Sequence, residues 1–130
     1  MKTKTIRQSV TFRAPPHEVY EALMDSEKHA RFTGAGASIS CRVGGRFTAY
    51  DGSLEGENLE LVPDVKILQS WRSDDWPEGH YSRATFSLAK VEGGTRLTFT
   101  QTGVPEDFYE DVKQGWIDYY WEPMKRLLEK

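Results

Sequence analysis

The sequence has little cysteine, little excess charge and no long apolar run. Its 130 residues include one cysteine, Cys41, which cannot form an intramolecular disulfide, so a disulfide-stabilised secreted scaffold is excluded. The formal net charge of −3 lacks the basic surplus on which nucleic-acid binding normally depends. No stretch resembles a signal peptide or approaches the roughly 20 apolar residues of a membrane-spanning helix. We therefore expect a cytoplasmic protein that neither binds nucleic acid nor inserts into a membrane.

Recognisable motifs for catalysis, metal binding or cofactor binding are also lacking. The three histidines, His17, His29 and His80, are too far apart in the sequence to suggest a metal site, and we expect all three at the surface. The stretch 34–36 (GAG) lacks the third glycine and the preceding strand of a dinucleotide-binding turn. No nucleophile–base or acid–base pair can be named. The sequence therefore predicts a non-enzymatic protein with no metal and no cofactor.

The first third of the chain predicts one strand and two short helices. Apolar and polar residues alternate over 3–12, which predicts a half-buried strand with Gln8 as the polar exception on its inner face. Two prolines at 15–16 suit the first turn of a helix that runs to Met24. Ser26 is a plausible N-cap for a second helix, which ends before Gly34.

The middle of the chain is divided by turn sequences at 44–45, 51–52, 63–64, 77–79 and 93–94. The strand-length pieces between them predict six strands in an antiparallel meander, and the first strand makes seven. The apolar residues of 53–62 change phase, which indicates a bulge near 57–58. Alternation over 37–43 predicts the first of these six strands, with Cys41 buried as a small inert side chain.

The chain ends in a predicted long helix from Glu106 to Leu128. Acidic residues gather in its first turns and basic residues near its end, which complements the helix dipole. Pro123 cannot donate to the carbonyl of Tyr119, so we expect a kink there. Gly115 would let the helix approach the sheet closely. The face that we expect to be buried carries Val112, Trp116, Tyr119, Pro123 and Leu127, with Tyr120 and Met124 beside it and Trp121 turned away.

Together these elements predict a single α+β domain over 1–130 with helix-grip architecture. A twisted seven-stranded antiparallel sheet would curl around the long C-terminal helix, and two short helices would follow the first strand. Folds of this kind often enclose a cavity between helix and sheet. The strand residues that we expect to face the helix are Phe47, Phe86, Leu88, Leu97 and Phe99.

Several motifs resemble one known family. They read DGSLEG at 51–56, LVP at 61–63, WR at 71–72, WPEGH at 76–80, QGW at 114–116 and YY at 119–120. In order and spacing they resemble the C-terminal domain of the activators of the Hsp90 ATPase, within the Bet v 1-like or START-like superfamily. The resemblance implies the same helix-grip fold and a chaperone-accessory or protein-binding role, with an Hsp90-type chaperone as partner. The eukaryotic activators of that family carry a separate N-terminal domain that drives much of the activation, so we expect this chain alone to stimulate the ATPase weakly or not at all.

The aromatic residues permit two interpretations. The side chains of Phe32, Trp71, Phe86, Trp116, Tyr119 and Tyr120 either form an ordinary core or line a cavity for a small hydrophobic ligand or lipid, with Gln8 and Asn58 adding polar contacts. Trp76, in an acidic turn, either anchors a protein partner or folds back over the sheet. A cyclase- or hydrolase-like enzyme, as found elsewhere in the superfamily, is the weaker alternative.

Overall fold

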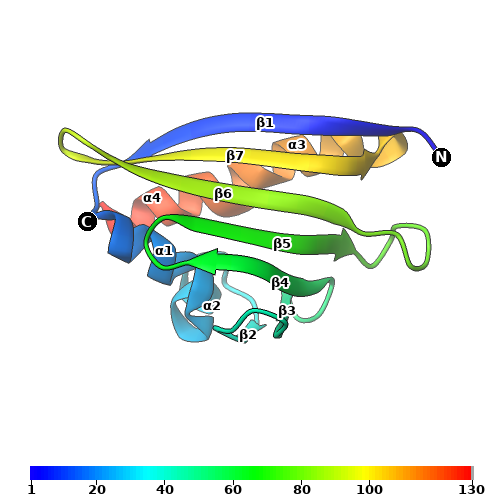
Figure 1. The fold of residues 1–130 in the computed structure, drawn as a ribbon, viewed down its shortest axis with the longest axis horizontal. Helices are drawn as coiled ribbons and strands as arrows, with labels where there is room; N and C mark the ends of the chain where they lie inside the picture. The colour runs from blue at the N-terminus through cyan, green and yellow to red at the C-terminus, as the bar shows by residue number, and fades with distance from the viewer. Residues whose placement is uncertain (130) are drawn as a thin grey trace.

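The computed structural model describes residues 1–129, which form a curved sheet with helices packed behind it (Figure 1). The strands are β1 (Thr3–Phe12), β2 (Ser38–Ile39), β3 (Arg46–Ala49), β4 (Leu54–Val62), β5 (Lys66–Ser73), β6 (Ser82–Val91) and β7 (Gly94–Pro105). The helical elements are α1 (Pro16–Met24), α2 (Ser26–Thr33), a 3₁₀ turn η1 (Glu106–Phe108), α3 (Tyr109–Trp116), a π-helical turn η2 (Ile117–Trp121) and α4 (Glu122–Leu128).

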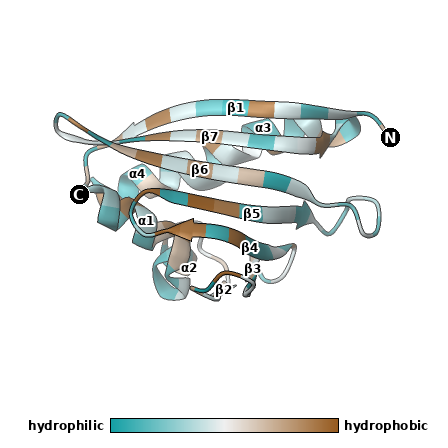
Figure 2. Ribbon diagram, in the orientation of Figure 1, coloured by the Kyte–Doolittle hydropathy of each residue, from teal (hydrophilic) through white to brown (hydrophobic). Residues whose placement is uncertain are grey.

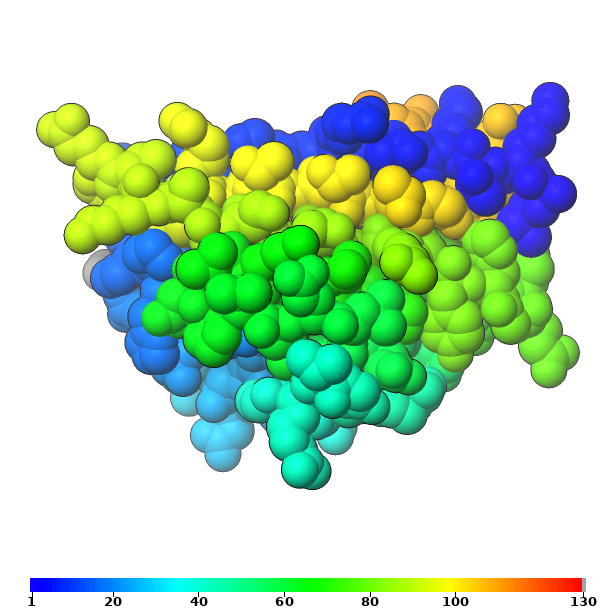
Figure 3. All heavy atoms as spheres, viewed as in Figure 1, coloured from blue at the N-terminus to red at the C-terminus, as the bar shows by residue number. Residues whose placement is uncertain are grey.

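The sheet is an antiparallel meander closed by the first strand, with the order β1-β7-β6-β5-β4-β3-β2. Apolar residues alternate along the strands (Figure 2), and the register places Phe86 opposite Phe99 and Leu88 opposite Leu97. These four residues and Phe47 are all buried. In the same orientation, the strands cover nearly all of the final helix (Figure 3). The predicted seven-stranded helix-grip fold and its core strand residues are therefore confirmed.

The predicted bulge in β4 is present, and it changes the neighbouring segment. The β4–β5 register shifts between Asn58 and Glu60. The buried Asn58 amide donates to the carbonyls of Ser40 and Arg42, at 2.6 and 3.1 Å. These carbonyls bond the Asn58 side chain, and that of Arg42 also accepts the N–H of Gly45 in a turn, so the regular strand β2 stops at Ile39. The predicted strand over 37–43 is wrong beyond that point, and Cys41 is exposed rather than buried.

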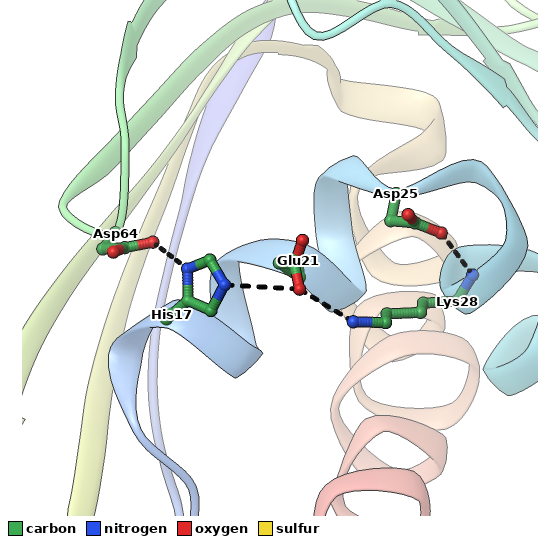
Figure 4. Close-up of polar contacts among 5 residues, drawn as sticks. All are labelled: His17, Glu21, Asp25, Lys28 and Asp64. Atoms are coloured by element: carbon green, nitrogen blue, oxygen red, sulfur yellow. Dashed lines mark hydrogen bonds and ion pairs between the residues drawn. The ribbon is translucent and has the colours of Figure 1, made fainter.

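The junction of α1 and α2 is held by polar contacts at the surface (Figure 4). Asp25, not Ser26, caps α2, because its carboxylate accepts the backbone N–H of Lys28 at 3.0 Å. Glu21 lies between His17 and the Lys28 ammonium, and the ammonium is 2.8 Å away. The other ring nitrogen of His17 contacts Asp64 at 3.0 Å. These contacts join α1 to α2 and to the β4–β5 turn.

The final helix is interrupted by the π-helical turn rather than simply kinked. Pro123 has no N–H, so the carbonyl of Tyr119 lacks its usual donor four residues on. The backbone N–H of Glu122 donates to the carbonyl of Ile117, five residues earlier. The Tyr119 carbonyl instead accepts the Tyr50 hydroxyl at 2.9 Å. The wider turn shifts the helix register, which makes Tyr119 59% exposed and buries Trp121, so the predicted buried face is wrong at both positions.

Two tryptophans attach this helix to the sheet through glutamines. The indole N–H of Trp116 donates to the Gln101 side chain at 2.8 Å, and that of Trp121 donates to Gln8 at 2.7 Å. Gln8 also donates to the carbonyl of Lys113 at 3.0 Å, which accounts for a polar residue on the inner face of β1. The expectation for Gly115 is wrong, since a Cβ there would meet only the Tyr119 ring, at 3.6 Å.

Candidate functional site

The main cavity is an open pocket of about 470 Å³ at one end of the final helix. It lies between η1 and α3 on one side and the β3–β4 turn, β5 and the β5–β6 loop on the other. Its wall is predominantly apolar and aromatic. The lining residues are Tyr50, Ser53, Leu54, Trp71, Ser73, Asp75, Trp76, Phe108, Asp111, Val112, Gly115, Trp116, Tyr119 and Tyr120.

The structure brings four of the six candidate ligand-binding residues to this pocket: Trp71, Trp116, Tyr119 and Tyr120. The other two lie elsewhere in the aromatic cluster. The ring of Phe32 packs on Tyr120 at 5.6 Å, and that of Phe86 packs on Phe99 at 5.0 Å. Both side chains are buried among other core residues, so they can shape the pocket only through their neighbours.

Neither of the polar residues expected to contact a ligand lines the pocket. The side chain of Gln8 accepts a hydrogen bond from Trp121 and donates one to the carbonyl of Lys113. Asn58 accepts a hydrogen bond from Gln69 at 3.1 Å and holds the bulge of β4. Sequence reasoning missed Tyr50 and Phe108, which both line the pocket. Tyr50 directly precedes the DG turn of the quoted motif, and Phe108 opens the aromatic-rich segment.

Trp76 is part of the pocket wall and not a free surface anchor. Its side chain is 4% exposed and packs edge-on against Trp71, with 5.3 Å between ring centroids. The indole N–H of Trp76 is buried and has no hydrogen-bond acceptor among residues 1–129. Trp116 and Trp121 differ in this respect, because each donates to a glutamine. Trp76 therefore has a buried donor without an acceptor in the described part of the chain, as does nearby Arg72 at its Nε.

The pocket mouth is shaped by a turn in an uncommon backbone conformation. Tyr50 and Asp51 have φ values of 50° and 58°, in the left-handed region, which costs about 1–2 kcal/mol for a residue with a side chain. Two contacts hold the turn: the Tyr50 hydroxyl on the Tyr119 carbonyl, and the Asp51 carboxylate on the N–H of Gly36 at 2.7 Å. Burial raises the pKa of Tyr50 to about 12, so its hydroxyl remains a donor.

Behind the pocket, His29 is buried, which corrects the expectation that all three histidines lie at the surface. Its Nδ1 lies 3.1 Å from the carbonyl of Leu23, and its Nε2 lies 3.0 Å from the Tyr120 hydroxyl. A carbonyl only accepts, so Nδ1 carries the proton and Nε2 accepts from Tyr120. Burial lowers the pKa of His29 from 6.5 to about 4. The imidazole is therefore neutral at physiological pH and holds Tyr120 in place.

This histidine predicts a loss of stability in mild acid. The unfolded imidazole binds a proton near pH 6.5, whereas the folded one resists protonation down to about pH 4. The contribution of His29 to the free energy of unfolding is complete above pH 6.5, and it falls as the pH is lowered to about 4. At about 1.4 kcal/mol per pKa unit, the loss is roughly 3 kcal/mol. Urea unfolding measures this loss across the same pH range. The free energy of unfolding of the wild type should fall more steeply toward acid than that of His29→Gln.

His17→Gln is the matched control for that experiment. The hydrogen bond with Asp64 raises the pKa of the exposed His17. Its contribution to stability is therefore present below the unfolded pKa and disappears as the pH rises, which is the opposite sign. A wild-type protein whose stability follows that of His29→Gln through the whole range would contradict a buried neutral imidazole.

Residues 1–129 contain neither a candidate metal cluster nor a helix able to span a membrane. No group of three or more His, Cys, Asp or Glu side chains is placed to hold a metal ion in this part of the chain. Within the same residues, no helix has the length and apolar character needed to cross a bilayer.

Comparison with known proteins places the chain in a family. The model of the family described as "Activator of Hsp90 ATPase homolog 1-like protein" matches residues 13–129. The human activator of 90 kDa heat shock protein ATPase homolog 1 is 36% identical over 116 residues, which are 89% of this chain and 34% of the human protein. An uncharacterised protein of Schizosaccharomyces pombe is 36% identical over 128 residues, which are 98% of this chain and 38% of that protein.

Solved structures agree with the sequence comparison. The crystal structure of an Hsp90 activator from Plasmodium falciparum superposes with a TM-score of 0.90 at 27% identity, over 96% of each chain. The chain thus spans about a third of the length of these curated relatives, but nearly all of that solved structure. From the family match and the identity to the human protein, the chain belongs to the activator of Hsp90 ATPase homolog 1-like family.

Proposed function

We propose that this chain is a non-enzymatic accessory protein of an Hsp90-type chaperone. The observation that carries the proposal is the 36% identity to the human activator over 89% of this chain. Two further relatives, from Dictyostelium discoideum and Saccharomyces cerevisiae, are also named as an activator and a co-chaperone of this chaperone. These names describe regulators of another protein's ATPase, so they support a binding role and give no support to the enzymatic alternative.

Exposed Cys41 provides the label for a direct test of this proposal. A fluorophore is attached to this thiol, and the labelled chain is titrated with the purified Hsp90-type chaperone of the same organism. Binding is measured as a rise in fluorescence anisotropy. We expect saturable binding that unlabelled Cys41→Ser reverses by competition, because that variant lacks the label but keeps the surface. A flat titration, or a signal that the competitor does not reverse, would overturn the proposal.

The ATPase rate measured in the same mixtures supplies a further prediction. We expect the chain to stimulate hydrolysis by less than about tenfold, which corresponds to less than about 1.4 kcal/mol of barrier. The reason is that the matched part of this chain spans about a third of the length of the relatives named as activators. Stimulation well above tenfold at saturation would show that the remainder of those proteins is not needed for activation.

A second candidate function is the binding of a small apolar ligand, and the pocket favours it. Its volume of about 470 Å³ lies within the range of about 300–1,000 Å³ typical of small-molecule sites. The motifs that carry the family resemblance also meet there, through Ser53–Leu54, Trp71, Trp76, Gly115–Trp116 and Tyr119–Tyr120. A simple aromatic core would need no opening at this position.

A further inference from the structure

We propose that this pocket selects an organic cation, meaning a small molecule with an apolar or aromatic body and one ammonium or guanidinium group. The inference rests on the proposed ligand-binding role of the pocket and adds the charge of the ligand. It is carried by two features of the lining: its aromatic rings and its two carboxylates.

The aromatic lining supplies surfaces to which a cation is attracted. Seven of the fourteen lining residues are tryptophan, tyrosine or phenylalanine. The face of an aromatic ring attracts an ammonium or guanidinium group, and more strongly when water is excluded. The same rings would also pack on the apolar body of the ligand. An aromatic wall alone, however, would accept neutral molecules as readily.

The charges at the pocket distinguish a cation from a neutral molecule. The ionisable acids of the lining are Asp75, in the β5–β6 loop, and Asp111, in α3. Neither carboxylate forms an ion pair within residues 1–129. The lining contains no lysine, arginine or histidine. An ammonium group would therefore meet two uncompensated negative charges, whereas a carboxylate or phosphate would be repelled and find no cationic partner.

The Trp76 indole beside the pocket has a buried N–H that no group within residues 1–129 satisfies, and this N–H has no surface open to the pocket. Buried polar groups in native proteins almost always have partners, but this donor does not carry the proposal. The left-handed backbone of Tyr50 and Asp51, at the mouth, is a feature that packing alone would not require. Trp121 does not line the pocket, so its indole signal is an internal reference.

Three probes with one aromatic body and different charges test the proposal: 1-naphthylmethylammonium, 1-naphthylmethanol and 1-naphthoate. Each is titrated into the ¹⁵N-labelled chain, and the indole N–H signals of the four tryptophans are followed by NMR. We expect the cation to shift the Trp76 and Trp71 signals saturably while the Trp121 signal stays in place. The neutral alcohol should bind several-fold more weakly, and the anion should have no measurable effect.

The double variant Asp75→Asn/Asp111→Asn tests the charge directly. Both side chains are exposed, so the variant should fold normally. Its affinity for the cation should fall by about three- to tenfold, and its affinity for the alcohol should be unchanged. Asp118→Asn is the control, because Asp118 is an exposed acid of the same helical region that does not line the pocket.

The outcomes separate the charge preference from the pocket itself. Equal affinity for all three probes, tighter binding of the anion, or a double variant that binds the cation as the wild type does would overturn the cation preference and leave a general apolar site. If none of the probes moves any indole signal, both the cation preference and the ligand-binding role are overturned.

Discussion

Replacing Trp116 by alanine is expected to unfold the domain or leave it barely stable. Its side chain is 3% exposed and packs on Phe99 at 4.4 Å and on Tyr120 at 4.6 Å between ring centroids. Truncating a buried tryptophan costs about 3–5 kcal/mol. The change also leaves the buried acceptor of Gln101 without its donor, which adds about 1–3 kcal/mol. The sum is comparable with the roughly 5–15 kcal/mol that holds a whole domain together.

Urea midpoints measure this effect, and Tyr119→Ala is the control. Tyr119 lies on the same stretch of helix but is 59% exposed, so its truncation should shift the midpoint little. The two midpoints should therefore be far apart. Equal midpoints would contradict the assignment of Trp116 to the core. A stable Trp116→Ala that gains affinity for small aromatic compounds would instead mean that the pocket tolerates the lost ring.

Trp121→Ala should be nearly as damaging as Trp116→Ala. In a regular α-helix these residues, five apart, would point about 140° from each other, and Trp121 would tolerate truncation. The π-helical turn brings them to one face, where their rings stack at 5.5 Å with 20° between planes. Truncation removes that contact and the hydrogen bond to Gln8. We again expect a loss of about 3–5 kcal/mol.

The same urea series decides this prediction. Midpoints of Trp116→Ala and Trp121→Ala should be shifted in the same direction and by similar amounts. Pro123→Ala in the wild-type background restores the missing N–H, and it shows whether the proline is needed for the turn. A Trp121→Ala midpoint close to that of Tyr119→Ala would mean that the helix keeps regular α-helical register.

Most of the fold could be predicted because it depends on local patterns. Alternation over 3–12 and the paired turn residues at 93–94 determine which side chains face inward and where strands reverse, independently of distant contacts. The phase change of β4 indicated the bulge for the same reason. The interrupted strand at 37–43 could not be predicted, because it depends on the Asn58 side chain reaching the carbonyls of Ser40 and Arg42.

The buried face of the final helix was mispredicted because α-helical periodicity was assumed across the proline. Pro123 was recognised as removing a hydrogen bond, but the consequence depends on Tyr50 supplying the replacement donor from the β3–β4 turn. The spacing of five between Trp116 and Trp121, together with Pro123, is the signal that could have indicated a wider turn. His29 was missed for a related reason, since its partners Leu23 and Tyr120 meet it only in the folded chain.

The sequence predicted what kind of site to expect, but not which residues line it. An aromatic-rich helix over a curled sheet indicated either a core or a cavity, and the structure contains both. Phe32 and Phe86 belong to the core, whereas Trp71, Trp116, Tyr119 and Tyr120 reach the pocket. Tyr50 and Asp75 enter the lining because two turns close over one end of the helix, and no periodicity within a strand encodes that closure.

Association with an Hsp90-type chaperone is the central functional claim, and native mass spectrometry of the protein purified from its own source tests it most directly. Mild lysine cross-linking before purification retains partners that dissociate quickly. We expect a species whose mass equals this chain plus the chaperone of that organism, identified by its peptides. Recovery of the chain only in free form, or cross-linked only to other proteins while the chaperone is abundant in the same extract, would contradict it.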